Sequence, residues 1–172
     1  MMNRRMIRSI IILPGTVLVF IPAMILLLTR DSRFHPDISS PDEIRFWVAI
    51  LLAGVGIMFS VWTSTLFMRF GEGTPAPWAP PRKMVIRGPY RHVRNPMILS
   101  VLVSLLAEAI FFQSWPIAFW MIIFFFGNAV YFPLVEEKDL EKRFGEDYLR
   151  YKAHVPRWVP RLRGWKDSGG DR

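Results

Sequence analysis

Two polar clusters flank the most apolar part of the chain, and both contain residue types that can hold a small charged ligand. The first is GPYRHVRNP at residues 88–96, with two arginines, a histidine, a tyrosine and an asparagine between prolines. The second is the pair Glu136-Glu137. A glutamate can accept hydrogen bonds from an ammonium group, and an arginine can bind a carboxylate. The two clusters together therefore suit a zwitterionic or cationic ligand.

Each cluster also has a simpler interpretation. Basic residues at the end of a membrane helix commonly bind anionic headgroups, and acidic residues after a helix commonly form a solvated face. Three features favour a ligand. The glutamate pair follows an apolar helix, whose C-terminal dipole disfavours anions, so a cation is expected nearby. Pro89 and Pro96 stiffen the basic stretch. Tyr90, His92 and Asn95 add directional hydrogen-bonding groups.

Long apolar blocks surround these clusters and predict the elements that position them. About 20 apolar residues are needed to cross ~30 Å of hydrocarbon. Such spans are expected at about residues 9–29, 44–70, 97–112 and 116–135. A short turn between the last two spans makes them an antiparallel helical hairpin. Because a hairpin brings its two open ends together, the two polar clusters are expected to lie near each other.

The ends of these helices also have sequence signals. SSPDE predicts that the second span begins with Ser40 as the N-cap and Pro41 at the first helical position. A charged, amphipathic pattern from Glu136 to Tyr151 predicts one C-terminal helix. The sequence as a whole predicts an all-α, polytopic membrane protein of about four transmembrane helices, with a helical hairpin and a cytosolic C-terminal helix.

Charge and composition predict the orientation and exclude some function classes. A four-span topology with both termini in the cytosol places 19 of the 22 lysines and arginines inside. In a prokaryote the membrane would be the inner cell membrane. The net charge is +8, but the basic residues lie next to the expected spans, so nucleic acid is not an expected partner. The chain has no cysteine, which excludes thiolate chemistry, and no metal site is expected. Gly54-Val55-Gly56 lies within a span and is interpreted as helix packing.

The clusters and the C-terminal segment resemble those of the isoprenylcysteine carboxyl methyltransferase family and of the related phospholipid methyltransferases. The resemblance is carried by GPYRHVRNPM, the glutamate pair and FGEDYLRYKAHVPRWVP. It covers about residues 71–163, and the combined motif is more specific than any of its parts. These families are multi-span membrane enzymes that use S-adenosyl-L-methionine, so the resemblance implies that cofactor here.

The resemblance also implies roles for segments and residues. We expect N-terminal transmembrane helices over 1–70, a methyltransferase core over 71–163 with a cofactor loop, the hairpin and the amphipathic helix, and a disordered tail over 164–172. Glu136 would hold the methionine amino group, and Arg94 and Glu137 are the expected catalytic residues. The expected cofactor-binding residues are Lys83, Met84, Val85, Tyr90, His92, Arg94, Asn95, Pro96, Ile98 and Glu136.

The chain departs from the family pattern at three positions. Asn95 replaces a histidine but can still donate and accept hydrogen bonds. Ile98 replaces a tyrosine, which removes a hydroxyl group. Phe132 stands where eukaryotic prenylcysteine enzymes carry a substrate-binding arginine. A prenylcysteine carboxylate is therefore a poor candidate for the acceptor, whereas the cofactor site is mostly retained.

These observations predict an integral membrane methyltransferase that acts on a lipophilic or small acceptor at the cytosolic face. Its expected partners are the lipid bilayer and this acceptor, with neither nucleic acid nor a metal. Two alternatives stay open. One is an NADPH-dependent membrane reductase, because sterol reductases have a similar tyrosine-rich C-terminal segment. The other is a non-enzymatic adaptor that binds anionic lipid through its basic cytosolic face.

Overall fold

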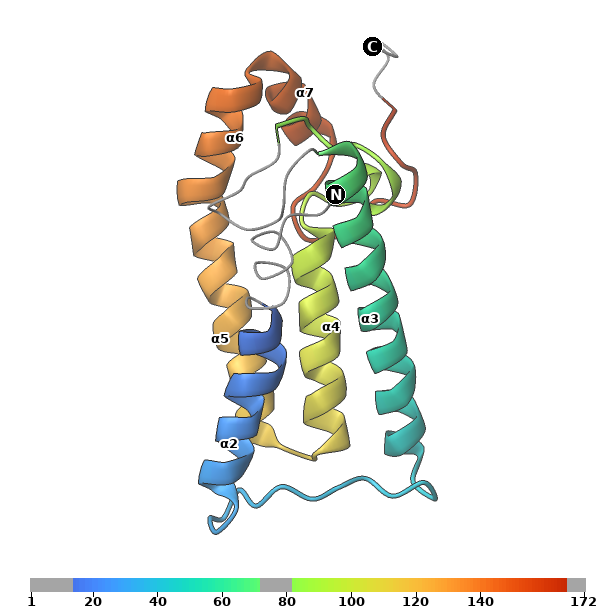
Figure 1. Ribbon diagram of the computed structural model, residues 1–172, viewed down its shortest axis with the longest axis vertical. Helices are drawn as coiled ribbons and strands as arrows, with labels where there is room; N and C mark the ends of the chain where they lie inside the picture. The colour runs from blue at the N-terminus through green and yellow to red at the C-terminus, as the bar shows by residue number, and fades with distance from the viewer. Residues whose placement is uncertain (1–13, 72–81, 167–172) are drawn as a thin grey trace.

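The computed structural model describes residues 14–71 and 82–166, and all regular structure in these ranges is helical (Figure 1). The expected all-α class is thus confirmed for the described chain. The start of the first span, most of the loop after the second span and the last six residues lie outside the described ranges. The main helices are α2 (Ile21–Thr29), α3 (Ile44–Phe70), α4 (Pro96–Phe111), α5 (Trp115–Tyr131), α6 (Glu137–Phe144) and α7 (Glu146–His154).

Helices α3 and α4 lie side by side along most of their length (Figure 1). Gly56 is buried at this interface, where an added Cβ would come within 2.3 Å of Ser104 Oγ and 3.1 Å of the Ser100 carbonyl oxygen. An added Cβ at Gly54 would meet nothing within 4 Å. Small residues allow such close approach of two helices. The interpretation of this glycine pair as helix packing is therefore confirmed for Gly56 alone.

Helices α4 and α5 form the expected antiparallel hairpin (Figure 1). Gln113 turns the chain with a positive φ of 47°. Ser114 caps α5, because its side chain accepts a hydrogen bond from the Ile117 backbone nitrogen at 3.5 Å. The hairpin brings residue 95, before α4, and residue 136, after α5, to the same end of the molecule.

The bounds predicted for the second span, 44–70, are confirmed, but the N-cap predicted for it was wrong. Helix α3 begins at Ile44 with the extended residue Glu43 as its N-cap. Ser40 instead donates its hydroxyl to the Asp42 carboxylate, and its carbonyl accepts a hydrogen bond from the Glu43 backbone nitrogen at 2.9 Å. These bonds stabilise a turn, so Pro41 lies before the helix.

The expected single C-terminal helix was also wrong. Helix α5 passes through a π-helical turn at Phe132–Glu136 directly into α6, and Gly145, with φ of 53°, separates α6 from α7. Glycine tolerates this left-handed conformation, which ends the helix. The glutamate pair therefore lies within a continuous helix, and the argument from a helix C-terminus does not apply.

The expected disorder of the tail is wrong for its first residues. Trp165 stacks on the His154 ring, with 5.5 Å between centroids, and contacts the Tyr151 ring at 5.9 Å. Gly164 packs against His92, and an added Cβ at Gly164 would lie 3.0 Å from His92 Nε2. Residues 164 and 165 are thus held by contacts with α7 and with the loop before α4.

Among the described residues, two helices are long and apolar enough to cross a membrane, Ile44–Phe70 and the continuous helix Trp115–Phe144. In each of these helices, only 11% of the apolar 18-residue stretch is buried inside the molecule, unlike the core helix of a soluble protein. Thr16–Thr29 and Pro96–Phe111 are apolar but shorter. A 16-residue helix rises about 24 Å, less than the ~30 Å of a typical hydrocarbon core.

We predict that Gly56→Ala destabilises the protein by about 1–3 kcal/mol, because the added methyl group overpacks the α3–α4 contact. Thermal unfolding in detergent should show a lower midpoint for this variant. Gly54→Ala is the matched control and should unfold like the parent, since its methyl group meets open space. Equal midpoints for the two variants would contradict the packing described here.

Candidate active site at the end of the helical hairpin

The loop that joins α3 to α4 presents most of the sequence-predicted site residues. We call residues 88–95 the site loop. It starts with a 3₁₀ turn at Gly88–Arg91. Gly88 has φ of 53°, and an added Cβ would lie 3.0 Å from Leu66 and 3.1 Å from Trp62. The Tyr90 ring packs on Phe67, with 5.2 Å between centroids. These contacts seat the site loop against α3.

A second segment covers the site loop. Residues 155–166, which we call the C-terminal strap, run beside the site loop and form backbone hydrogen bonds with it (Figure 1). The backbone hydrogen bonds run from Arg94 N to Pro156 O at 2.9 Å, from Arg161 N to His92 O at 3.0 Å and from Trp165 N to Arg91 O at 2.8 Å. The ordered tail thus holds the loop in one conformation.

Two side chains of the site loop also bind the C-terminal strap. Arg91 Nε donates to the Trp165 carbonyl oxygen at 2.8 Å. His92 Nδ1 lies 2.8 Å from the Arg161 carbonyl oxygen. A carbonyl oxygen is only an acceptor, so this contact requires the proton on Nδ1. Both side chains therefore contribute to docking of the strap.

The tyrosines of the FGEDYLRY motif, Tyr148 and Tyr151, stabilise the site loop. Tyr151 donates its hydroxyl to the Tyr90 carbonyl oxygen at 2.6 Å. Tyr148, Tyr151 and Val155 form a buried cluster, against which Met84 also packs. Burial raises the pKa of Tyr148 to about 12 and that of Tyr151 still further, so both stay neutral.

The Glu137 carboxylate connects the segments that build the site. Its side chain is 2% exposed. Arg94 Nη1 lies 2.8 Å from one carboxylate oxygen, Arg157 donates from Nε at 2.7 Å and from Nη2 at 2.9 Å, and Lys152 Nζ lies 3.3 Å away. This carboxylate raises the pKa of Arg157 above its ordinary value. The site loop, α6, α7 and the C-terminal strap thus meet at one anion.

Its neighbour Glu136 has a different environment. Its side chain is half-buried, and within the described residues its carboxylate has no ion pair and no hydrogen bond. Tyr90 lies close enough for the Glu136 charge to affect its pKa. Burial raises the pKa of Tyr90 well above its ordinary value, and Tyr151 and Glu136 raise it further. The two adjacent glutamates therefore differ: Glu137 is paired with three cations, whereas Glu136 forms no ion pair within the described residues and interacts with the charge of Arg143 only at longer range.

Three polar atoms of the site loop lack protein partners. The Tyr90 hydroxyl, Arg94 Nε and Asn95 Nδ2 are buried, and none of them has a hydrogen-bond partner within the described residues. An unsatisfied buried donor costs about 1–3 kcal/mol. Native structures keep such groups mainly where something else binds them. These donors, together with the unpaired Glu136 carboxylate, therefore offer contacts to a polar ligand.

The remaining predicted residues are spread around this centre. The Lys83 backbone nitrogen donates to the Gly71 carbonyl oxygen at 3.1 Å, and its side chain is exposed. Val85 is buried, and Ile98 is partly buried on α4. The structure thus brings Tyr90, Arg94 and the Asn95 amide to the glutamate end of the hairpin and leaves the other residues at its margins.

Sequence reasoning missed two residues that complete the ionic cluster, Lys152 and Arg157. Arg157 lies in the VPRWVP motif, where its type alone gives no partner. The expectation of a cation near the glutamates was the available signal. It did not identify the donor, because the strap that carries Arg157 returns from beyond α7.

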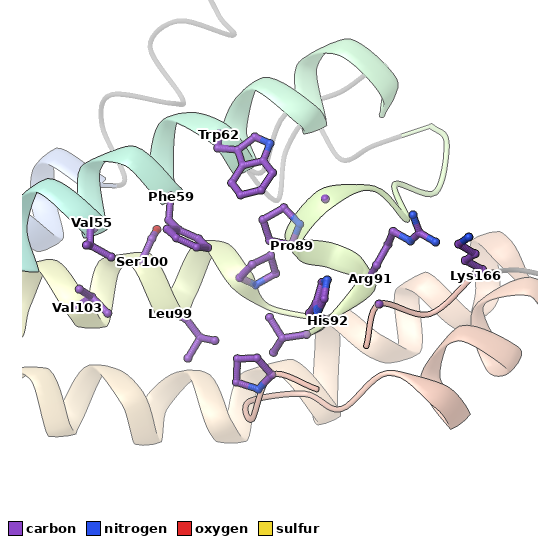
Figure 2. A pocket seen from close by; sticks show the side chains of 16 residues that line it. Val55, Phe59, Trp62, Pro89, Arg91, His92, Leu99, Ser100, Val103 and Lys166 are labelled. Atoms are coloured by element: carbon purple, nitrogen blue, oxygen red, sulfur yellow. The ribbon is translucent and has the colours of Figure 1, made fainter. Parts of the chain in front are cut away.

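A cavity of about 690 Å³ lies on the α3 side of the site loop (Figure 2). Of the predicted site residues, only His92 and Pro96 line it. Tyr90, Arg94, Asn95 and Glu136 do not, so this space is separate from the cluster of unpartnered donors. Within the described residues, no group of three or more histidines or acidic residues is placed to hold a metal ion.

The part of the chain that contains this site matches the model of a known protein family. The family model for phospholipid methyltransferases matches residues 44–147. The match includes α3, the site loop, the hairpin, both glutamates and α6. No curated protein matches the chain.

We predict that Glu137→Gln lowers the free energy of unfolding by about 3 kcal/mol, because it leaves Arg94 without its buried counter-ion. Glu136→Gln is the control on the adjacent residue, and it should unfold like the parent because its carboxylate forms no ion pair with any described residue. The measurement is thermal unfolding in detergent at fixed salt. If Glu137→Gln unfolds no earlier than Glu136→Gln, the ionic cluster does not hold the site together.

Proposed function

The chain belongs to the phospholipid methyltransferase family, and from this premise we propose that it transfers a methyl group from S-adenosyl-L-methionine to a lipophilic acceptor at the cytosolic membrane face. One observation carries the proposal. Three buried donors of the GPYRHVRNP motif have no hydrogen-bond partner within the described residues, and they lie at the same end of the hairpin as Glu136, which forms no ion pair there. This arrangement suits a ligand with an ammonium group and several acceptor oxygens.

The residues of the site fit the polar groups of this cofactor. The Glu136 carboxylate would hold the amino group of its methionine part. Arg94 Nε and the Asn95 amide would donate to carboxylate or ribose oxygens, and the Tyr90 hydroxyl would take a further polar contact. Lys83, Met84, Val85, His92, Pro96 and Ile98 remain proposed contacts from the family resemblance alone.

When bound, the cofactor supplies a methyl group on a positively charged sulfonium. The protein's contribution is positioning, which can supply roughly 7–11 kcal/mol of the barrier. Glu137 holds Arg94 in place through a 2.8 Å ion pair. Because Arg94 carries one of the unpartnered donors, we propose that Glu137 is a positioning residue. The C-terminal strap covers the site loop, and exclusion of water from this end of the hairpin would strengthen electrostatic contacts there.

The two alternative functions have less support. An NADPH reductase needs cations for a 2′-phosphate, but the three cations of the Glu137 cluster, Arg94, Lys152 and Arg157, already bind that carboxylate. A lipid-binding adaptor needs no buried, unpartnered donors, whereas the site loop retains three. The family membership also favours methyl transfer over both.

The site must lie at the membrane surface that is reached by a soluble cofactor. We propose that α3 and the part of the Trp115–Phe144 helix up to about residue 135 cross the bilayer, and that the two shorter apolar helices complete four spans. The site loop, α6 and α7 then lie on the cytosolic side with both termini, as the distribution of basic residues favours. The 30–43 segment lies on the opposite side.

We predict that S-adenosylhomocysteine binds the detergent-purified protein and that Glu136→Gln weakens binding roughly tenfold to 100-fold. This range corresponds to the loss of one hydrogen bond to a charged group. Isothermal titration calorimetry gives both dissociation constants. Glu141→Gln is a matched control, because Glu141 lies on the same helix and pairs with Lys152 at 2.6 Å.

Two results would separate the proposed functions. Binding of NADPH without S-adenosylhomocysteine would support the reductase. Binding of neither compound, with unchanged thermal unfolding, would favour the adaptor and contradict the proposal.

The topology can be tested because the chain contains no cysteine. We predict that a cysteine at position 38 reacts with a membrane-impermeant maleimide on intact spheroplasts, whereas one at position 142 reacts only after permeabilisation. Both parent residues, Ile38 and Lys142, are exposed, so access to the reagent depends on the side of the membrane. The reverse labelling pattern would invert the proposed orientation.

A further inference from the structure

The C-terminal strap bends sharply beside the helical hairpin. The chain turns at residues 157–159, and we call residues 158–162 the strap tip. Backbone hydrogen bonds of Pro156 and Arg161, at 2.9 Å and 3.0 Å, join the chain on both sides of this bend to the site loop. The strap tip is therefore held in a fixed place against the start of α4.

Aromatic contacts show how far the strap tip reaches along the hairpin. The Trp158 ring packs against Phe125 and Phe132, with 5.3 Å and 5.9 Å between centroids. The bilayer-crossing part of this helix extends to about residue 135, so the two phenylalanines lie about 15 Å and 5 Å inside its end. The strap tip thus lies at the depth of the proposed span, not beyond it.

The strap tip also presents large apolar side chains to its surroundings. Val159 is 75% exposed and Leu162 is 98% exposed. Phe126, next to the Trp158 contact on α5, is 60% exposed. Exposed apolar side chains grouped in this way commonly mark a contact with a membrane or with another protein. Because Trp158 seats the tip on a helix suited to cross the bilayer, hydrocarbon is the expected contact.

The backbone of this segment suits the edge of the hydrocarbon. Non-helical backbone at membrane depth is costly unless its polar groups are satisfied. Pro156 and Pro160 have no N–H group that would need a partner. The Arg161 N–H is satisfied by the His92 carbonyl oxygen. The bend therefore leaves fewer free backbone donors than an ordinary loop would.

Basic residues follow the apolar side chains. Arg163 and Lys166 are exposed, and neither forms an ion pair within the part of the chain that the structure describes. Basic side chains beside an interfacial apolar segment reach the headgroup level and attract anionic lipids. The apolar tip and the basic residues after it together match the two layers of a bilayer surface.

We propose that the strap tip is a bilayer-contacting surface. Trp158, Val159 and Leu162 enter the edge of the hydrocarbon beside α5, and Arg163 and Lys166 bind phosphate groups of anionic lipids. This contact depends on the crossing of the bilayer by the helix that contains α5, but it does not depend on methyl transfer. Because the strap also bonds to the site loop, the bilayer then helps to hold the cover of the candidate site in place.

The experiment uses the full chain, whose lack of cysteine allows single-site labelling. Val159→Cys and Leu162→Cys are labelled with the fluorophore NBD in nanodiscs of phosphatidylcholine and phosphatidylglycerol. We expect blue-shifted emission that is quenched several-fold by lipids with a doxyl group near the headgroup end of one acyl chain. Leu149→Cys is the matched control, because Leu149 is exposed on α7, beyond the end of the span, and its label should emit as in water (Figure 1).

Phe126→Cys, within the proposed span, separates failure of this contact from failure of the topology. Quenching at position 126 with water-like emission at 159 and 162 would overturn the proposal and leave the span intact. Blue-shifted but unquenched labels at 159 and 162 would overturn it as well, because the tip would then contact a second copy of the chain. Absence of quenching at all three positions would contradict the topology itself. Titration with S-adenosylhomocysteine on the same samples tests the methyltransferase function separately.

A second measurement tests the phosphate contact. Doxyl-labelled phosphatidylglycerol should quench the label of Leu162→Cys more strongly than doxyl-labelled phosphatidylcholine at the same mole fraction. Adding Arg163→Gln and Lys166→Gln should reduce this excess roughly fivefold, because each residue loses its attraction to an anionic surface. Lys142→Gln, an exposed lysine on α6, is the control and should leave the excess unchanged. Equal quenching by the two lipids in the parent would overturn the phosphate contact.

Discussion

The architecture of the site depends on one buried anion. The Glu137 carboxylate is 2% exposed and binds cations from the site loop, α7 and the C-terminal strap. A buried carboxylate is costly unless it is paired and hydrogen-bonded, so these segments must converge for the fold to accommodate it. The convergence fixes Arg94, and with it the conformation of the loop that carries the unpartnered donors. The cluster thus links the last helices to the start of α4, more than 40 positions earlier in the chain.

Two adjacent residues of the same type acquire different roles from this geometry. They occupy successive positions on one helix, about 100° apart around its axis, so they face different surroundings. Glu137 faces the C-terminal strap and is neutralised there, whereas Glu136 has no cation partner among the described residues. The site loop shows a similar division, because its donors lie apart from an apolar cavity on its α3 side. Such a two-sided loop is the arrangement that transfer between a soluble donor and a lipid would require.

Much of the fold followed from the sequence, because apolar blocks and turn residues are local signals. The bounds of α3, the hairpin turn at Ser114 and the meeting of the two polar clusters belong to this group. The π-helical turn that continues α5 into α6 contains Pro133, and a proline inside a helical pattern normally indicates an end or a kink, so the continuation of the helix was not predicted. The order of residues 164–166, the end of the strap, was missed for a different reason. Glycine, lysine and arginine are typical of disordered tails, and only tertiary contacts of Trp165 and Arg157 order this segment.

The most direct test is an experimental structure of the full chain in lipid nanodiscs with S-adenosylhomocysteine bound. The account predicts that the ligand's amino group lies within hydrogen-bonding distance of the Glu136 carboxylate, that its oxygens accept from Arg94 or Asn95, and that the Arg94–Glu137 ion pair is intact. A ligand bound at the opposite end of the helices, or one that replaces Arg94 as the partner of Glu137, would contradict it.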